Sequence, residues 1–341
     1  MSKISIACKP WPKAGADGQM PAKRILVLGA TGTIGRAVVG KLSARGHQVV
    51  CIVRPRAGGS GASQRDPALL LPAAELHFAE ITDPASLADP GFVGRGFDAV
   101  VSCLASRSGV PRDAWAVDYQ AHMNALSLAR ESGAEQMVLL SAICMQKPRL
   151  AFEKALIDSG LTYSIVRPTA YFKSLSGQIA RLQQGKPFLL FGDGRLTACK
   201  PISDADLAAY IADCLGDVSL QNRILPIGGP GPAITSRQQG ECLFGRLDRA
   251  PHFRQVPASL LSTAAALLSV PAKLLPPLAA RAELARIGHY YATESMLLLD
   301  PETGRYDADA TSETAKDTLQ AYYRRVIDGL EQVERGEHAV F

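Results

Sequence analysis

The chain has 341 residues, of which 47% are hydrophobic, and a formal net charge of +5. That length allows one large core or one and a half domains, and the small, dispersed charge without basic–aromatic runs argues against nucleic acid as a partner. The seven cysteines are scattered and form no C-x-x-C pair, which favours a reducing compartment and argues against a zinc or iron–sulfur site.

Residues 1–22 are predicted to form a disordered arm. The first 20 contain lysines, prolines and glycines and no apolar h-region, so we expect no secretory signal and a cytoplasmic protein.

Residues 25–35 read ILVLGATGTIG, an apolar run that continues into glycines spaced G-x-x-G-x-x-G and then into a predicted helix. Gly29 allows a tight turn off the strand, Gly32 allows the backbone to approach a pyrophosphate, and Gly35 allows the helix to pack closely on the sheet. The start of a helix presents unpaired N–H groups and a positive dipole end, so this loop is predicted to bind a dinucleotide. The predicted binding residues are Gly29, Thr31, Gly32, Thr33, Ile34 and Gly35.

A second predicted strand over 47–54 ends at Arg54. An NAD-specific site places Asp or Glu at this point, whereas this chain has Arg54, then Arg56, and no acid until Asp66. Because arginine holds a 2′-phosphate well, the predicted cofactor is NADPH. The alternative is that these arginines only solvate a loop.

The pattern of strand and helix continues to about residue 141, with further strands at 76–81, 98–105, 136–142 and 164–168 and a long helix over 117–133. This alternation predicts an α/β fold with a Rossmann-type doubly wound parallel sheet. Ligands of such sheets bind outside the carboxyl ends of the strands. The additional cofactor-binding residues predicted there are Glu80, Ile81, Ser102, Leu104, Ala105, Ser141 and Pro168.

We expect an NADPH-binding Rossmann domain over 23–170 and a smaller, irregular, Gly- and Pro-rich substrate-binding region over 171–341 that completes the fold. Prolines cut the apolar stretch 256–280 into a helix of about 13 residues, too short to cross a bilayer. It is either a buried or partly exposed helix, or a hydrophobic lid or membrane-surface contact. A packing helix is predicted over 314–333, with one face formed by Leu319, Tyr323, Val326, Leu330 and Val333.

The motif GATGTIG, without a Tyr-x-x-x-Lys pair after the fifth strand, resembles the atypical, NmrA-like short-chain dehydrogenases/reductases. Longer strings closely resemble the NADPH-dependent 3,8-divinyl chlorophyllide 8-vinyl reductases of chlorophyll and bacteriochlorophyll synthesis. They follow the family's order from residue 141 to about 319: SAICMQKP, LTYSIVRPTAYFKSLSGQ, GKPFLLFGDG, CKPISDADLAAYIADC, LPIGGPGPAIT, IGHYYATESMLLLDPETG and KDTL. The resemblance implies hydride transfer from NADPH to the 8-vinyl group of divinyl (proto)chlorophyllide, a magnesium tetrapyrrole, with a peripheral position at the photosynthetic membrane as one option.

The resemblance also suggests site residues. Tyr171, Lys173 and Lys154 are the candidate proton donors, with a core position as the alternative for Tyr171 and a solvated helix position for Lys154. Lys173 or Arg149 could hold the substrate carboxylate, and the alternative for each is a solvated position on the surface. His289 could approach the magnesium, although an ordinary hydrogen-bonded histidine is the simpler interpretation.

One departure from the family pattern follows QKP, where the family continues F-Q-x-A-K-L-x-F-E. This chain reads QKPRLAFEK and is shorter by about seven residues, close to two helical turns. Whether the deletion lies before Phe152 or after Ala155, Lys154 does not align cleanly with the family lysine. The apolar face of the helix should stay in phase, so we expect the fold to survive and activity to be lower.

Other functions remain open at this point. One alternative is a non-catalytic NADPH-sensing or pigment-protein assembly factor on the same fold. An isoflavone-reductase-like or epimerase-like enzyme would need the family lysine or a Tyr-x-x-x-Lys pair. The sequence does not determine the preferred tetrapyrrole or the oligomeric state.

Overall fold

The computed structural model describes residues 21–55, 66–87, 94–106, 110–143, 146–269 and 276–333. Residues 1–20 of the predicted arm, Arg56 and residues 270–275 of the apolar stretch lie outside these ranges.

A seven-stranded sheet forms the centre of the described structure, in the order β3-β2-β1-β4-β5-β6-β9. All its neighbouring strands pair in parallel. This confirms the predicted doubly wound sheet, whose order reverses between β1 and β4. The strands are β1 (Arg24–Leu28), β2 (Gln48–Val53), β3 (Glu75–Phe78), β4 (Ala99–Ser102), β5 (Gln136–Leu140), β6 (Thr162–Pro168) and β9 (Arg223–Ile227).

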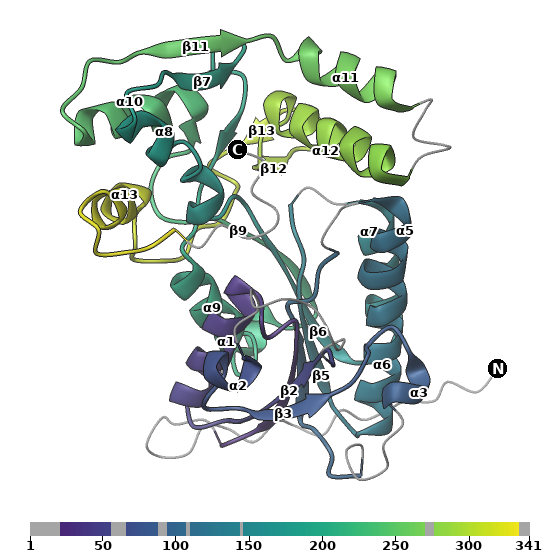
Figure 1. Cartoon of the computed structure of the whole chain (residues 1–341). Coiled ribbons are helices and arrows are strands. Elements are labelled where there is room, and N and C mark those ends of the chain that lie inside the picture. Colours follow the sequence, from purple (N-terminus) through teal and green to yellow (C-terminus); the bar gives the residue numbers. More distant parts are fainter. Residues whose placement is uncertain are drawn as a thin grey trace.

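Helices cover both faces of the sheet (Figure 1). One face carries α1 (Thr33–Ala44), α2 (Pro67–Leu70) and α9 (Asp204–Asp213), and the other carries α3 (Pro84–Leu87), α5 (Pro111–Ala114), α6 (His122–Glu131) and α7 (Lys147–Ile157). Side chains alternate across a strand, so Val27 of β1 packs in the cluster with α1 and α9, whereas Leu28 packs in the cluster with α6 and α7. Burial on both faces explains why β1 is a continuous apolar run.

The helix predicted over 117–133 is not uniform. Its first part, Trp115–Ala121, is a π-helix that joins α5 to α6. Such wide turns are rare and occur often at functional sites. Here the turn carries Asp118, which is buried and belongs to the polar network described below.

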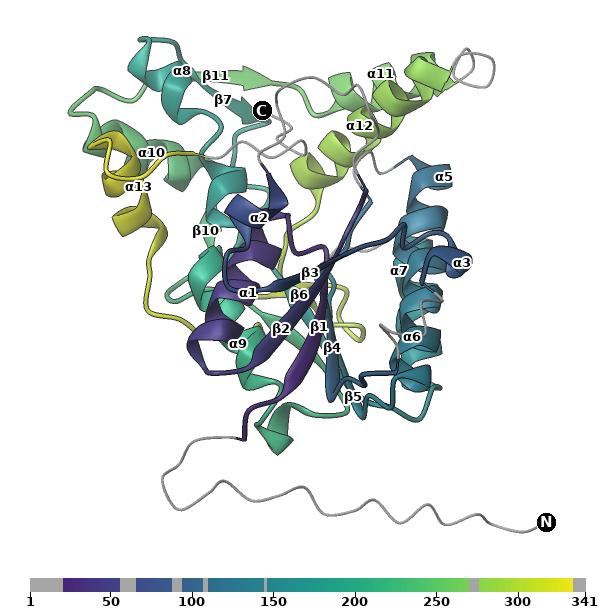
Figure 2. The same cartoon turned by 60° about the horizontal axis from the view of Figure 1, so that its bottom comes forward.

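The C-terminal region lies over the carboxyl ends of the strands (Figure 2). The two adjacent helices α11 and α12 cover one side of this end, and a third hydrophobic cluster joins β7, α10 and α13 on the other. The elements are α8 (Ile179–Gln183), β7 (Phe188–Phe191), β8 (Ala198–Cys199), β10 (Ile234–Thr235), α10 (Ser236–Arg246), β11 (Phe253–Val256), α11 (Ser259–Ser269), α12 (Pro276–Thr293), β12 (Leu298–Leu299), β13 (Tyr306–Asp307) and α13 (Leu319–Ile327), with 3-10 turns at Phe172–Leu175 and Val218–Leu220.

The packing helix predicted over 314–333 is shorter than expected. Leu319 and Tyr323 of α13 are buried, but the helix stops at Ile327 and Leu330 is 78% exposed. Gly329 has φ of +72°, the left-handed conformation that ends helices. The predicted apolar face therefore does not extend to Leu330.

The short helix predicted in the apolar stretch is present as α11, and a longer helix that was not predicted, α12, begins at Pro276. Proline suits the first turn of a helix because its missing N–H has no intrahelical partner there. Among the described residues, the structure contains no helix with the length and apolar character needed to span a membrane.

Candidate functional site

The glycine loop between β1 and α1 has the geometry that its sequence predicts. Gly29 has φ of +70°, and a Cβ built on it would lie 2.6 Å from the Cys103 backbone. A Cβ on Gly35 would overlap the Gly29 carbonyl oxygen, because α1 starts so close to the turn. On Gly32 the same atom would meet only that oxygen, at 3.3 Å. The space beside Gly32 is therefore open enough for a ligand.

The start of α1 is suited to an anion. Gly32 is the N-cap residue and has no side chain to cap the helix, and the first turn contains no acidic residue. The first N–H groups of the helix and its positive dipole end therefore remain available to a ligand phosphate.

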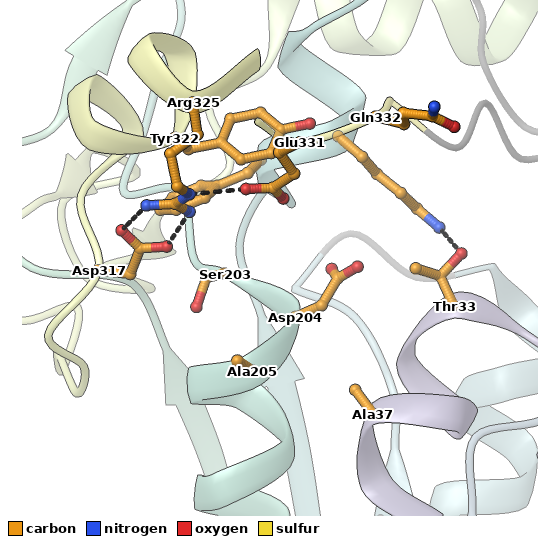
Figure 3. A pocket seen from close by; sticks show the side chains of 12 residues that line it. Thr33, Ala37, Ser203, Asp204, Ala205, Asp317, Tyr322, Arg325, Glu331 and Gln332 are labelled. Carbon is orange, nitrogen blue, oxygen red and sulfur yellow. Dashed lines mark hydrogen bonds and ion pairs between the residues drawn. The ribbon is translucent and has the colours of Figure 1, made fainter. Parts of the chain in front are cut away.

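Lys173 reaches this same turn from the segment after β6. Its ammonium donates a hydrogen bond to the Thr33 hydroxyl, the first residue of α1 (Figure 3). Both residues line a cavity of about 450 Å³, whose opposite wall comes from the start of α9 and from the α13 region. The structure thus places Lys173 at the phosphate end of the predicted cofactor site.

Arg54 lies at the carboxyl end of β2, as predicted, but it has an acidic neighbour that the local sequence does not show. Its Nε is 3.7 Å from Oε2 of Glu80, which follows β3, and the two side chains are 55% and 39% exposed. Glu80 also accepts a hydrogen bond from the Thr82 hydroxyl at 2.9 Å. The fold therefore brings two predicted cofactor-binding residues together at the edge of adjacent strands.

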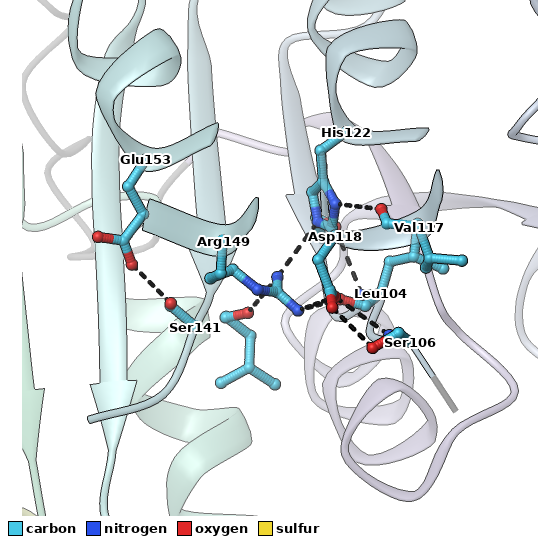
Figure 4. A network of polar contacts seen from close by, with 10 residues as sticks. Leu104, Ser106, Val117, Asp118, His122, Ser141, Arg149 and Glu153 are labelled. Atoms are coloured by element: carbon cyan, nitrogen blue, oxygen red, sulfur yellow. Dashed lines mark hydrogen bonds and ion pairs between the residues drawn. The ribbon is translucent and has the colours of Figure 1, made fainter. Parts of the chain in front are cut away.

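A buried polar network fixes the loop after β4 (Figure 4). Nη2 of Arg149 lies 2.6 Å from the Asp118 carboxylate and donates to the Leu104 carbonyl at 3.0 Å. Asp118 in turn accepts hydrogen bonds from the Ser106 backbone N–H and hydroxyl, at 3.1 and 2.7 Å. Two side chains from the helical face thus hold the backbone of residues 104–106, which includes the predicted cofactor residues Leu104 and Ala105.

His122 completes this network. Its Nδ1 lies 2.9 Å from the Val117 carbonyl, which only accepts, so Nδ1 carries the proton and Nε2 accepts from the Ser102 hydroxyl at 3.0 Å. Burial, and then the positive charge of Arg149, lowers the pKa of His122 to about 3. The imidazole is therefore neutral and keeps Ser102, at the end of β4, in a fixed orientation.

Ser141, at the end of β5, is held by a different side chain, that of Glu153. Its hydroxyl donates to Glu153 at 2.5 Å, and Glu153, only 2% exposed, also pairs with Arg167 of β6. Ile143 N–H donates to the Pro168 carbonyl at 3.2 Å, so the ends of β5 and β6 are joined directly. Ser102, Ser141 and Pro168 thus lie along the carboxyl edge of three consecutive strands of the sheet.

The predicted proton donors lie in different surroundings. Lys154 is 78% exposed and pairs with Asp158 one turn along α7. Tyr171 is half-buried, directly after β6, and packs against the core cluster together with Cys103. Burial, and then the carboxylate of Asp204, raises the pKa of Tyr171 above that of an ordinary phenol. Of these candidates, only Tyr171 follows the carboxyl end of β6 without contacting the start of α1 or facing solvent.

The other two suggested substrate contacts, Arg149 and His289, differ in how deeply they are buried. Arg149 is 9% exposed and committed to Asp118, so its predicted surface alternative is wrong. His289 is half-buried on α12. Helix α7 keeps its apolar face in phase, as predicted, because Phe152 and Leu156 are fully buried.

Comparison with known proteins shows the family of the chain. A family model described as NAD(P)H-binding matches residues 29–218. The chloroplastic divinyl chlorophyllide a 8-vinyl-reductase of Zea mays is 47% identical over 355 residues, which cover 99% of this chain and 88% of that protein. The chain belongs to this reductase family.

Solved structures with low identity share the fold. The leucoanthocyanidin reductase of Vitis vinifera, solved with NADPH, has a TM-score of 0.62 and 14% identity and covers 89% of this chain and 99% of its own. An NADPH-dependent quinone oxidoreductase of Escherichia coli, also complexed with NADPH, has a TM-score of 0.61 and 19% identity at the same coverage. These likenesses confirm the Rossmann-type architecture of this member of the reductase family.

Asp118, His122 and Glu153 are site residues that the sequence did not reveal. Asp118 and His122 lie within an amphipathic pattern that predicts only a packing helix, and charged residues are rarely buried unless they are paired. For Glu153 a signal was present, because placing the deletion before Phe152 aligns Glu153 with the F-E of the reductase family pattern.

Proposed function

We propose that this protein reduces the 8-vinyl group of divinyl chlorophyllide, or a closely related magnesium tetrapyrrole, to an ethyl group with NADPH. The observation that carries this proposal is the 47% identity to the maize reductase along 99% of the chain. The reaction adds a hydride to one carbon of the vinyl double bond and a proton to the other, and NADPH becomes NADP⁺.

The residues of this chain fit a dinucleotide. The loop from Gly29 to Gly35 and the start of α1 would hold the phosphates, and the ends of β4, β5 and β6 would hold the nicotinamide half. Arg54 supports NADPH over NADH, because a guanidinium pairs well with a 2′-phosphate. When bound, the cofactor supplies the hydride.

The protein's own share of the chemistry is then mainly positioning. Arg149 and Asp118 hold residues 104–106, and Glu153 holds Ser141, so the edge that faces the reacting rings is preorganised. The macrocycle can delocalise the negative charge left by hydride addition, so a weak acid suffices. We assign the proton to the Tyr171 hydroxyl, which follows the carboxyl end of β6 and, like any phenol, is protonated at neutral pH.

The surface formed by α11 and α12 suits contact with a membrane surface, where a pigment with apolar character is accessible. Leu260 and Leu267 of the uncharged helix α11 are 60% and 72% exposed, and Leu284 of α12 is 50% exposed. Replacement of Leu260 and Leu267 by Gln should reduce flotation of the protein with lipid vesicles. Unchanged flotation would refute this contact.

The experiment that tests the reaction is expression in a host that lacks its own 8-vinyl reductase. An active reductase replaces divinyl pigments by monovinyl pigments, whereas an NADPH-sensing or assembly protein leaves them unchanged. With purified protein, Tyr171→Phe should lower turnover about 10²-fold or more if Tyr171 is the acid. Tyr163→Phe, at the opposite end of β6, is the matched control and should retain turnover.

A further inference from the structure

Lys173 occupies a well-defined position rather than the end of a mobile loop. It belongs to the 3-10 turn Phe172–Leu175, whose Phe172 is 2% exposed and contacts the ring of Tyr322 with centroids 5.3 Å apart. The Phe172 N–H also donates to the Ile202 carbonyl at 3.2 Å. The backbone that carries Lys173 is therefore fixed, and so is the direction from which its ammonium reaches Thr33.

Thr33 is where the phosphate-binding turn begins. An ammonium group hydrogen-bonded to the hydroxyl of the first helical residue lies within one side chain's length of the first backbone N–H groups. The adjacent Gly32 leaves space open beside that turn. A cation at this place adds a full positive charge to the partial charge of the helix end, and both attract the same anion.

The second cation of the cavity is already committed to carboxylates. Among the described lining residues, Arg325 is the second cation, and it pairs with Asp317 at 2.6 Å and with Glu331 at 2.7 Å. Its charge is therefore neutralised within the α13 region. Lys173 donates to the hydroxyl of Thr33, at the start of α1.

We propose that Lys173 binds the diphosphate of NADPH against the first turn of α1, and is not the proton donor of the reaction. This inference rests on the proposed function for the identity of the cofactor. It means that the region after β6, expected to serve the substrate, also contributes a ligand to the cofactor. The glycine loop and the substrate region would thus be joined by the cofactor itself.

The test compares Lys173→Met and Lys173→Arg with the wild type, with Lys186→Met as the matched control. Lys186 is an exposed lysine that contacts Gln184. Binding is measured by titration with NADPH and, separately, with adenosine 2′-phosphate, which has the 2′-phosphate but no diphosphate. Turnover is measured at saturating NADPH, and thermal unfolding shows whether each variant is folded.

Loss of a charge-assisted contact should raise the Kd for NADPH about tenfold or more in Lys173→Met, and less than about threefold in Lys173→Arg, which keeps the charge. Binding of adenosine 2′-phosphate and turnover at saturation should change less than about twofold, and Lys186→Met should match the wild type.

Two results would overturn the inference. An unchanged Kd for NADPH with a large fall in turnover would make Lys173 an acid or a substrate ligand. An equal loss for both nucleotides would place its effect outside the diphosphate. Failure of the proposed function looks different: the wild type would bind NADPH and leave the vinyl group unreduced, whatever Lys173 does.

Discussion

Helix α7 carries two ion pairs of nearly equal length, one buried and one exposed to solvent. Breaking the buried pair should lower the free energy of unfolding far more than breaking the exposed pair. Arg149 and Asp118 are 2.6 Å apart with side chains 11% and 8% exposed, whereas Lys154 and Asp158 are 2.7 Å apart with side chains 78% and 60% exposed. Removal of one partner leaves a buried charge behind in the first pair and a hydrated charge in the second. The perturbations are Arg149→Met and Lys154→Met.

The magnitude follows from burial. Breaking a buried pair costs about 3–5 kcal/mol, and we expect the lower end for Arg149→Met, since Asp118 keeps its two hydrogen bonds from Ser106. The exposed i,i+4 pair contributes about 0.3–0.5 kcal/mol. With an m-value of about 3 kcal/mol/M, the urea midpoint should fall by about 1 M in Arg149→Met and by about 0.1 M in Lys154→Met.

The assay is equilibrium unfolding in urea, followed by circular dichroism and by tryptophan fluorescence. Arg149→Lys keeps the charge but has a single nitrogen, whereas the guanidinium contacts Asp118 and the Leu104 carbonyl through Nη2 and the Leu140 carbonyl through Nη1. Its midpoint should therefore lie between those of the wild type and Arg149→Met. Equal midpoint shifts in the two methionine variants would refute the reasoning. The same Lys154→Met protein also tests the candidate acid, because an exposed, solvated lysine should leave turnover unchanged.

Further predictions concern the cofactor, pH and the shortened helix. Arg54→Ala should weaken NADPH about tenfold or more and NADH far less; equal losses in titrations would contradict the 2′-phosphate assignment. Gly32→Val should abolish NADPH binding while circular dichroism stays native, because the side chain would fill the open phosphate space; normal binding would show that the loop has another role. The pKa of His122 is lowered to about 3, so its imidazole stays neutral in the folded protein, whereas in the unfolded chain it takes up a proton below pH 6.5. The free energy of unfolding should therefore fall by about 1.4 kcal/mol for each pH unit of acidification below pH 6.5. His122→Gln should lose that slope between pH 6 and 5, and an unchanged slope would exclude this histidine as its cause. Insertion of a family-like F-Q-x-A-K-L-x segment between Leu150 and Phe152 should raise turnover with little change in NADPH affinity, by up to about 10²–10⁴-fold if the missing lysine is a positioned acid; unchanged turnover would make that lysine dispensable.

The sequence alone determined the features that depend on local geometry. The apolar run of β1, the turn at Gly29 and the close start of α1 at Gly35 involve neighbours within a few positions, so residue types and spacing predict them directly. The doubly wound parallel sheet and the loops at its carboxyl ends follow from the βαβ pattern, since parallel strands joined by helices allow few arrangements. The position of β9 in this sheet came only from the structure, because its residues lie in the region expected to be irregular. The family strings identified the reductase for the same reason, because long ordered strings are rarely shared by chance.

Only the tertiary structure decided which charged residues belong to the site. Arg54 meets Glu80 across two strands, and Lys173 meets Thr33, which lies 140 positions earlier. Lys154 was a candidate by sequence, yet it faces solvent, while Arg149 five residues before it is buried. Burial and pairing of a charge depend on which elements the fold brings against it, and a long polar side chain has no local pattern that reveals this. The apolar spacing of a helix tells which face packs, but the partners that neutralise a charge on that face come from the rest of the chain.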